Sequence, residues 1–260
     1  MSIKVSTGLS NELAGVSGFR QNLTGGRMLL FSGSQPANAD SASSGTLLGV
    51  LTDTSRAHTG ETLPVWKITL SGTSGTLDTI TIGGLSILPA AITFAADLPA
   101  TAAAAALSIT NAFSLLDFKA VSSGADILIS GPNGSGALLN SMVCAATTTT
   151  LVATVAGSGA VFTSGVTALN GLQFTYPAVS GVIESTGTWS GVGVADGVAG
   201  SFRYCCDAAD AGTSASTTYR RIDGSITVTG GSGNATIDNT SVSTGQVITG
   251  VNLQFSVLKG

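Results

Sequence analysis

Apolar and polar residues alternate one by one in several short segments of this 260-residue chain. Phe202 and Tyr204, for example, alternate with Arg203 and Cys205. Side chains in a β-strand point to opposite faces in turn, so this period of two predicts strands with one face inward and one outward. The same alternation recurs at Trp66, Ile68 and Leu70, at Ile80 and Ile82, and at Val251, Leu253, Phe255 and Val257. Turns rich in glycine and serine separate these segments, and the sequence therefore predicts a mainly β protein.

Residues 1–24 follow a different pattern. Leu9 and Leu13 belong to a set of apolar residues spaced three or four apart, which is the spacing of one helix face. Gly15 and Gly18 interrupt this pattern, and each weakens a helix by about 1 kcal/mol relative to alanine. We expect an N-terminal arm or short helix, which packs either on its own domain or on a neighbouring subunit.

Residues 63–169 are interpreted as an inserted small α+β domain with the element order β-β-α-β-β. Its helix is expected from residue 100 to 116, after a cap at Asp97 and an early helical proline at Pro99. Its strands are expected around Trp66, around Ile80, at residues 118–121, at 126–130, and as one or two strands within the tract 144–157.

Residues 25–62 and 170–260 are interpreted as one discontinuous domain, an antiparallel β-sandwich or jelly roll. Asp196 and Gly197 are a residue pair suited to a tight hairpin turn ahead of the strand that contains Phe202. A polar loop, residues 207–218, follows that strand.

Charged residues make up only 9% of the chain, against about a quarter in typical domains. A surface with so few charges suits a protein that assembles with copies of itself; a Ser/Thr-rich extracellular β protein is the alternative. The net charge is −4, the isoelectric point is near 4.7, and the sequence contains no basic stripe that could neutralise the phosphates of a nucleic acid. These features argue against a nucleic-acid partner. Arg220 and Arg221 are the only adjacent basic pair and are interpreted as a solvated strand edge.

The three cysteines are Cys144, Cys205 and Cys206, an odd number with two of them adjacent. Neighbouring residues of a strand point to opposite faces, so Cys205 and Cys206 would need a distorted peptide to pair. No Cys/His spacing indicates zinc. We interpret the cysteines as small buried apolar side chains, with a cross-link between subunits as the alternative.

No catalytic, cofactor or metal site is expected. His58 is the only histidine and lies in the polar segment SRAHTGET, where a solvated loop residue is the preferred interpretation. The chain has no GxSxG motif, and its glycine-rich runs lack the lysine of a phosphate loop, so neither a histidine-activated nucleophile nor a phosphate site is indicated.

Four aspartates, Asp196, Asp207, Asp210 and Asp223, lie close enough in sequence to converge on calcium, which prefers oxygen ligands. Aspartates that bond the backbone of their own turns are the preferred explanation. Trp66 and Trp189 are interpreted as core anchors, not as sugar-binding platforms.

Two parts of the chain resemble a known group of proteins. The run WSGVGVADGVAGSFRYC, followed by DAADAG and RRIDGSI, and the upstream run GRMLLFSGSQPANADSASSGTLLGVLTD resemble small structural proteins encoded in tailed-bacteriophage genomes. The inserted domain resembles modules that recur in phage tail and baseplate proteins. These resemblances imply a virion component and no defined chemistry.

The favoured hypothesis is a non-enzymatic virion structural protein that self-associates on the capsid surface, neck or tail. Its expected partners are itself, possibly as a trimer, and major capsid, neck or tail proteins. No apolar run reaches 18 residues and no secretion signal is evident, so we expect no membrane partner and synthesis in the host cytoplasm. One alternative is a receptor- or glycan-binding module that uses Trp66 or Tyr219. The other is a hydrolase with clustered carboxylates.

Overall fold

The structure is a computed structural model that describes residues 2–15, 18–112, 117–155, 164–175 and 182–256. It is mainly β, as expected, with 42% strand and 13% helix. Contacts between Cα atoms divide the chain into two compact units. Unit 1 comprises Met1–Glu61 and Ala168–Gly260, and unit 2 comprises Thr62–Thr167.

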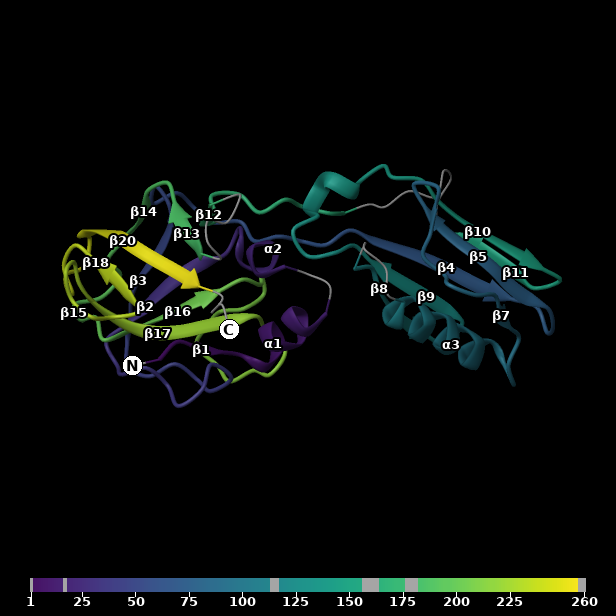
Figure 1. Ribbon diagram of the computed structural model, residues 1–260, viewed down its shortest axis with the longest axis horizontal. Helices are drawn as coiled ribbons and strands as arrows, with labels where there is room; N and C mark the ends of the chain where they lie inside the picture. The colour runs from purple at the N-terminus through teal and green to yellow at the C-terminus, as the bar shows by residue number, and fades with distance from the viewer. Residues whose placement is uncertain (1, 16–17, 113–116, 156–163, 176–181, 257–260) are drawn as a thin grey trace. The chain divides into compact units, whose positions relative to one another are not determined.

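Strands of unit 1 form a closed barrel of seven strands (Figure 1). In order around the barrel, they are β17 (Arg221–Val228), β16 (Ser201–Cys205), β2 (Arg27–Phe31), β3 (Leu47–Asp53), β14 (Trp189–Val192), β20 (Val247–Ser256) and β18 (Ala235–Ile237). The short strand β18 closes the barrel because it pairs with β17 in parallel and with β20 in antiparallel orientation. The pairings therefore give a closed barrel where the sequence predicted a two-sheet sandwich or jelly roll. Alternation cannot separate these architectures, since strands of both turn one face inward.

The remaining strands of unit 1 are short. They are β1 (Lys4–Val5), β12 (Gln173–Phe174), β13 (Val182–Thr186), β15 (Gly197–Val198) and β19 (Ser241–Val242). The hairpin predicted at Asp196 and Gly197 is wrong, because β14 pairs with β3 and β20, and β15 pairs with β19. The residues between Val192 and Ser201 instead form an excursion from the barrel end.

The amino-terminal segment forms two short helices, α1 (Thr7–Ala14) and α2 (Phe19–Leu23). Ser6 caps α1 by accepting a hydrogen bond from the backbone N–H of Leu9. Leu9 and Leu23 are both fully buried in the core of unit 1. The helices therefore pack on their own unit, and Gly15 and Gly18, which were predicted to interrupt the helical pattern, lie at the C-cap of α1 and the N-cap of α2.

Aromatic side chains fill the barrel interior. Phe174 lies edge-on to Trp189 at 5.4 Å and to Tyr204 at 5.8 Å between ring centroids. The Tyr204 hydroxyl donates to the carbonyl of Leu23 at 2.6 Å, so its polar atom is satisfied inside an apolar core. Phe202 and Leu253 are buried in the same core, as the alternation predicted, whereas Val257 lies outside the described residues.

The described part of unit 2 contains two four-stranded sheets, one α-helix and a short 3-10 helix. Its strands are β4 (Val65–Ser71), β5 (Thr76–Ile82), β6 (Leu85–Ser86), β7 (Ile92–Thr93), β8 (Lys119–Ser123), β9 (Asp126–Ser130), β10 (Cys144–Thr149) and β11 (Val152–Val155). One sheet has the order β11-β4-β9-β8, and in the other β10 and β6 flank β5, which also pairs with β7. The tract from Cys144 thus supplies two strands, as predicted.

Helix α3 (Leu98–Asn111) packs against β8 and β9 (Figure 1). Asp97 caps it as predicted, because its side chain accepts a hydrogen bond from the backbone N–H of Ala100, and Pro99 lies in the first turn. Ala102, Ala105, Ala106 and Ile109 face the core of unit 2. The predicted extension of the helix to residues 113–116 lies outside the described residues.

Candidate binding groove on the outer face of the barrel

The outer face of β16 and β17 is covered by the loops at residues 32–46 and 207–218, and buried ion pairs link the face to these loops. Arg203 Nε and Nη2 donate to the two carboxylate oxygens of Asp223 at 2.8 and 2.7 Å. Arg203 also donates to the carbonyls of Gly212 and Ser41 at 2.9 and 2.8 Å, which ties both loops to the barrel. This pair is almost fully buried, with 1% and 0% of the two side chains exposed.

A second pair joins Arg221 to Asp210, whose carboxylate oxygens accept from Nε and Nη2 at 2.6 and 2.5 Å. Burial raises the pKa of Asp210, but the hydrogen bonds from Arg221 and from the backbone N–H of Gly212 outweigh burial and leave that pKa below its usual value. The carboxylate is therefore ionised at neutral pH.

Arg220 pairs with Asp207 at 2.7 Å. The prediction that Arg220 and Arg221 form a solvated strand edge is wrong, because both side chains are buried. The error has a physical cause: the loop that follows β16 folds back over the strand and brings its own aspartates to the arginines. Local sequence shows the alternation of side chains along the strand but not which loop covers the outer face of that strand.

The four aspartates considered for calcium do not form a cation site. Asp207, Asp210 and Asp223 hold arginine guanidiniums. Asp196 lies elsewhere and accepts from the backbone N–H and hydroxyl of Thr244. Within the described residues, no three His, Cys, Asp or Glu side chains are grouped closely enough to hold a metal ion.

All three cysteines are free thiols and are buried, as predicted. Cys206 packs in the barrel core, whereas Cys205 packs on the outer face with Leu29 and Phe31. Burial raises the pKa of the Cys205 and Cys206 thiols, so neither forms a reactive thiolate at neutral pH.

The tryptophans are core residues, as predicted. Trp66 is buried in unit 2 and Trp189 in unit 1. The Tyr219 ring lies 5.5 Å from the guanidinium carbon of Arg221, in cation–π geometry. Because Trp66 is buried in the core of unit 2, its ring is not exposed to a ligand, and the structure gives no support for a stacking role in glycan binding.

The candidate site is an open groove on the outer face of β2, β3 and β14, which the loops that cover β16 and β17 leave accessible. Its volume is about 660 Å³, within the range of about 300–1,000 Å³ that ligand sites occupy. Its floor is apolar and consists of Leu29, Leu47, Val50 and Val192. The alternation predicted outward-facing positions on these strands but not that apolar residues would fill them.

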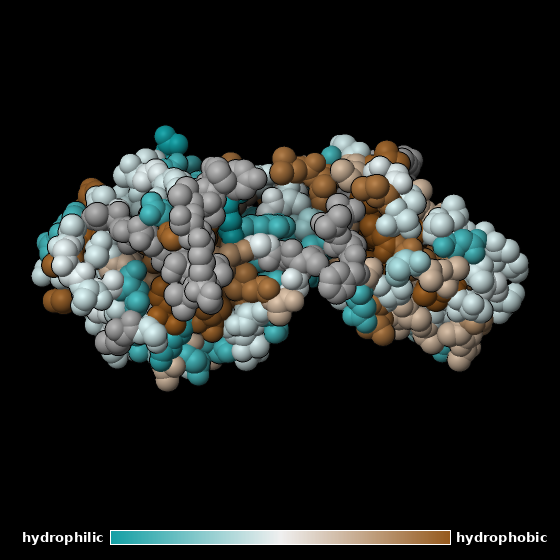
Figure 2. All heavy atoms as spheres, viewed as in Figure 1, coloured by the Kyte–Doolittle hydropathy of each residue, from teal (hydrophilic) through white to brown (hydrophobic). Residues whose placement is uncertain are grey.

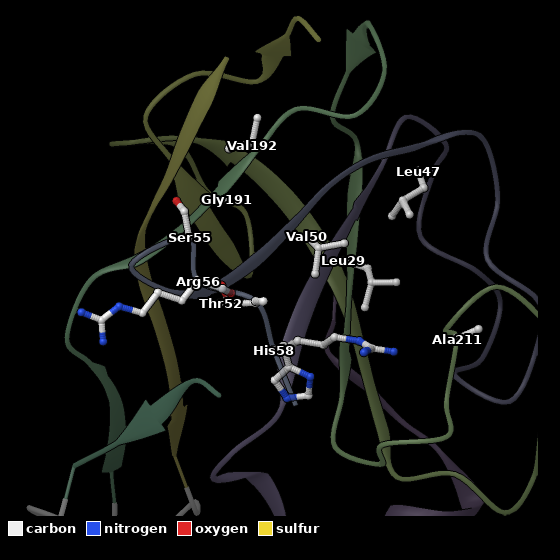
Figure 3. Close-up of a pocket in the computed structure, with 12 residues that line it drawn as sticks. Leu29, Leu47, Val50, Thr52, Ser55, Arg56, His58, Gly191, Val192 and Ala211 are labelled. Carbon is white, nitrogen blue, oxygen red and sulfur yellow. The ribbon is translucent and has the colours of Figure 1, made fainter. Parts of the chain in front are cut away.

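Basic side chains line one end of the groove. Figure 3 shows His58 and Arg56 at that end, with Leu47 and Val192 toward the other. Arg27 also lines it and donates to the carbonyl of Asp210 at 2.5 Å. No aspartate or glutamate is among the described residues that line the groove, and Arg56 forms no ion pair with any described residue.

His58 is half-buried at the basic end, not solvated as predicted. Its Nε2 lies 2.9 Å from the carbonyl oxygen of Gly25; because a carbonyl only accepts, Nε2 is the donor. Its Nδ1 is then an acceptor, and it is buried without a hydrogen-bond partner among the described residues. Burial lowers the pKa of His58, and nearby Arg27 lowers it further, so the ring is neutral at pH 7.

Comparison with protein-family models, with curated proteins and with solved structures finds no match to this chain. No helix among the described residues is long and apolar enough to cross a membrane.

Proposed function

We propose that this chain is a non-enzymatic structural protein of a tailed-bacteriophage particle, where it self-associates on the capsid surface, neck or tail. The proposal rests on one observation above all: apolar side chains gather on solvent-exposed surfaces that contain very few charges. Contiguous exposed apolar surfaces of this kind commonly mark sites where another protein binds. The resemblance of the two terminal regions to phage structural proteins supports the same assignment.

Unit 2 presents one such surface around η1 (Gly136–Leu139). Leu138 is 78% exposed, and Val143 and Leu85 are exposed beside it. They surround a small pocket of about 140 Å³ lined by Ile82, Gly83, Leu85, Phe118, Pro132, Leu139 and Met142. Figure 2 shows hydrophobic atoms, in brown, gathered over this region of unit 2.

This surface is electrically neutral as well as apolar. Residues 127–183 contain no Asp, Glu, Lys, Arg or His at all. Covering such a surface requires no charge to be removed from water, which is the largest cost in burying a protein surface. A neutral apolar surface therefore fits a permanent assembly better than a transient encounter, which is usually more polar.

The arginine–aspartate pairs of unit 1 stabilise the fold of that unit. The carboxylates of Asp207, Asp210 and Asp223 are each paired with an arginine and are not available as a general acid or base. We propose on this basis that the protein acts by surface burial between subunits, without a chemical step.

The test is to purify phage particles from a lysate that contains this sequence and to probe them with antibodies against the recombinant chain. We expect labelling of intact particles, a fixed copy number per particle by quantitative mass spectrometry, and self-association of the recombinant chain. Hundreds of copies would indicate the shell, and about a dozen the neck. Unlabelled particles together with a monomeric recombinant chain would refute the proposal.

A further inference from the structure

The excursion that follows β14 presents an acidic and apolar ridge next to the groove. Val194 and Val198 are 56% and 60% exposed, and Asp196 is exposed between them. Thr244 holds Asp196 in place with hydrogen bonds of 2.6 Å from its backbone N–H and 2.9 Å from its hydroxyl. These bonds lower the pKa of Asp196, so its carboxylate is charged at neutral pH.

This ridge and the basic residues lie at opposite ends of one surface. The backbone N–H of Val194 donates to the carbonyl of Leu48 at 2.8 Å, which places the ridge at the start of β3. Arg56 and His58 follow the end of β3. The strand between them has seven residues and spans about 20 Å at about 3.3 Å per residue.

The two ends are complementary in charge. Arg56 is exposed, and no ion pair is formed by it within the described part of the chain. Asp196 likewise has no cationic partner there, and its two hydrogen bonds use only Oδ1. Val50, which is half-buried, and Val192, which is 44% exposed, lie between the basic residues and the ridge and leave apolar surface open to a second copy.

We propose that the groove binds a second copy of this chain, about a two-fold axis that crosses the middle of β3. The Val194–Val198 ridge of each copy then lies over the basic end of the other copy's groove. Asp196 of each copy faces Arg56 of the other, and Val50 and Val192, which lie beside the middle of β3, meet their counterparts near the axis. This inference deepens the proposed function, on which it rests, by naming the partner and the contact.

A second copy is the occupant that the surface itself specifies. Ridge and groove belong to one chain and have opposite charge at opposite ends, so one two-fold rotation brings both complementary pairs together at once. Such an isologous contact is the commonest form of oligomer contact and closes after two subunits. Exposed Val192 and Val247, which lie opposite each other on β14 and β20, extend the apolar surface beside the groove.

The experiment is sedimentation velocity of the full chain over a range of concentrations, with charge-reversal variants. We expect the wild type to form a dimer. Asp196→Arg alone and Arg56→Asp alone each place like charges together and weaken dimerisation by about tenfold or more. The double variant restores the opposite charges and recovers most of the affinity. Asp196→Asn keeps an acceptor for Thr244 and tests the charge alone.

A second pair of variants separates the contact from general surface effects. Val192→Ser is expected to weaken the dimer, whereas Leu107→Ser, which changes an exposed leucine on α3 of unit 2, leaves it unchanged. Circular dichroism shows whether each variant is folded.

Three results would overturn the inference: a wild type that is monomeric or has an odd number of subunits, single reversals that dimerise as the wild type does, or a double variant no tighter than the singles. If the particles are labelled but one of these results is obtained, the proposed function stands and the contact is wrong. If the double variant rescues the dimer but the particles are unlabelled, the contact stands and the virion assignment is wrong.

Discussion

Replacement of Arg203 by methionine tests whether the buried ion pairs hold the loops on the barrel. The substitution preserves much of the aliphatic side chain but removes four hydrogen bonds: two to Asp223 and one each to the carbonyls of Gly212 and Ser41. It also leaves the Asp223 carboxylate buried without its counter-charge. Breaking a buried pair from one side costs about 3–5 kcal/mol, a large share of the roughly 5–15 kcal/mol that stabilises a domain.

The two units provide an internal control for this measurement. Trp189 lies in the core of unit 1 and Trp66 in that of unit 2, so single-tryptophan backgrounds (W66F or W189F) report on each unit by fluorescence. With a urea m-value of about 2 kcal/mol/M, Arg203→Met should lower the midpoint of the Trp189 transition by about 2 M. The transition reported by Trp66 should not move.

The matched control is the exposed ion pair of unit 2, between Lys67 and Asp126 at 3.2 Å, whose side chains are 45% and 29% exposed. Solvent screens such pairs, so Lys67→Met should leave the midpoint of the Trp66 transition almost unchanged. A loss below about 1 kcal/mol for Arg203→Met, or an equal shift of both transitions, would contradict the argument that burial makes the Arg203 pair important. Replacing Arg203 and Asp223 together by Met and Leu should recover part of the loss, because no unpaired charge then remains.

Two further predictions concern His58 and the helix of unit 2. Because burial lowers the pKa of folded His58 below 6.5, the unfolded chain binds more protons than the folded chain as pH falls below that value, and the free energy of unfolding of unit 1 should decrease. His58→Gln should reduce the difference between urea midpoints measured at about pH 7.5 and about pH 5.5. If the variant shows the same difference as the wild type, titratable groups other than His58 cause the pH dependence. Asp97→Ala removes the cap of α3 and should destabilise unit 2 by about 1 kcal/mol in the Trp66 transition, whereas Asp97→Ser should retain most of the stability.

Local sequence predicted the individual elements of this protein well where one face of an element meets a core. The inward positions Phe202 and Tyr204, the cap at Asp97 and the strand Asp126–Ser130 all follow from periodicity and end signals. These features depend on neighbouring residues only. The barrel could not be predicted in the same way, because its closure depends on β18, a strand of three residues whose partners lie on two other strands.

The same limit applies to the candidate site. The groove brings together residues from β2, from the end of β3 and from β14, which are separated by up to about 160 positions in sequence. No local motif marks such a set. The polar neighbours of His58 in sequence predict a solvated loop residue. Its neighbours in space, Arg27 and Gly25, instead determine its burial and its pKa.

The contrast between the two outer faces of the barrel favours a protein partner for the groove. On β16 and β17, the outer positions include arginine and aspartate; Arg203 and Asp223 pair with each other, Arg221 pairs with Asp210 of a loop, and loops of the same chain cover all three. On β3 and β14, Val50 is only half-buried and Val192 is 44% exposed, and Arg56 forms no ion pair among the described residues. The chain therefore covers its charged outer face with its own loops and leaves apolar side chains of the other outer face exposed. This arrangement is expected when another molecule covers the exposed apolar face. Since Asp196 on the ridge has the charge opposite to that of Arg56, that molecule can be another copy of the chain itself.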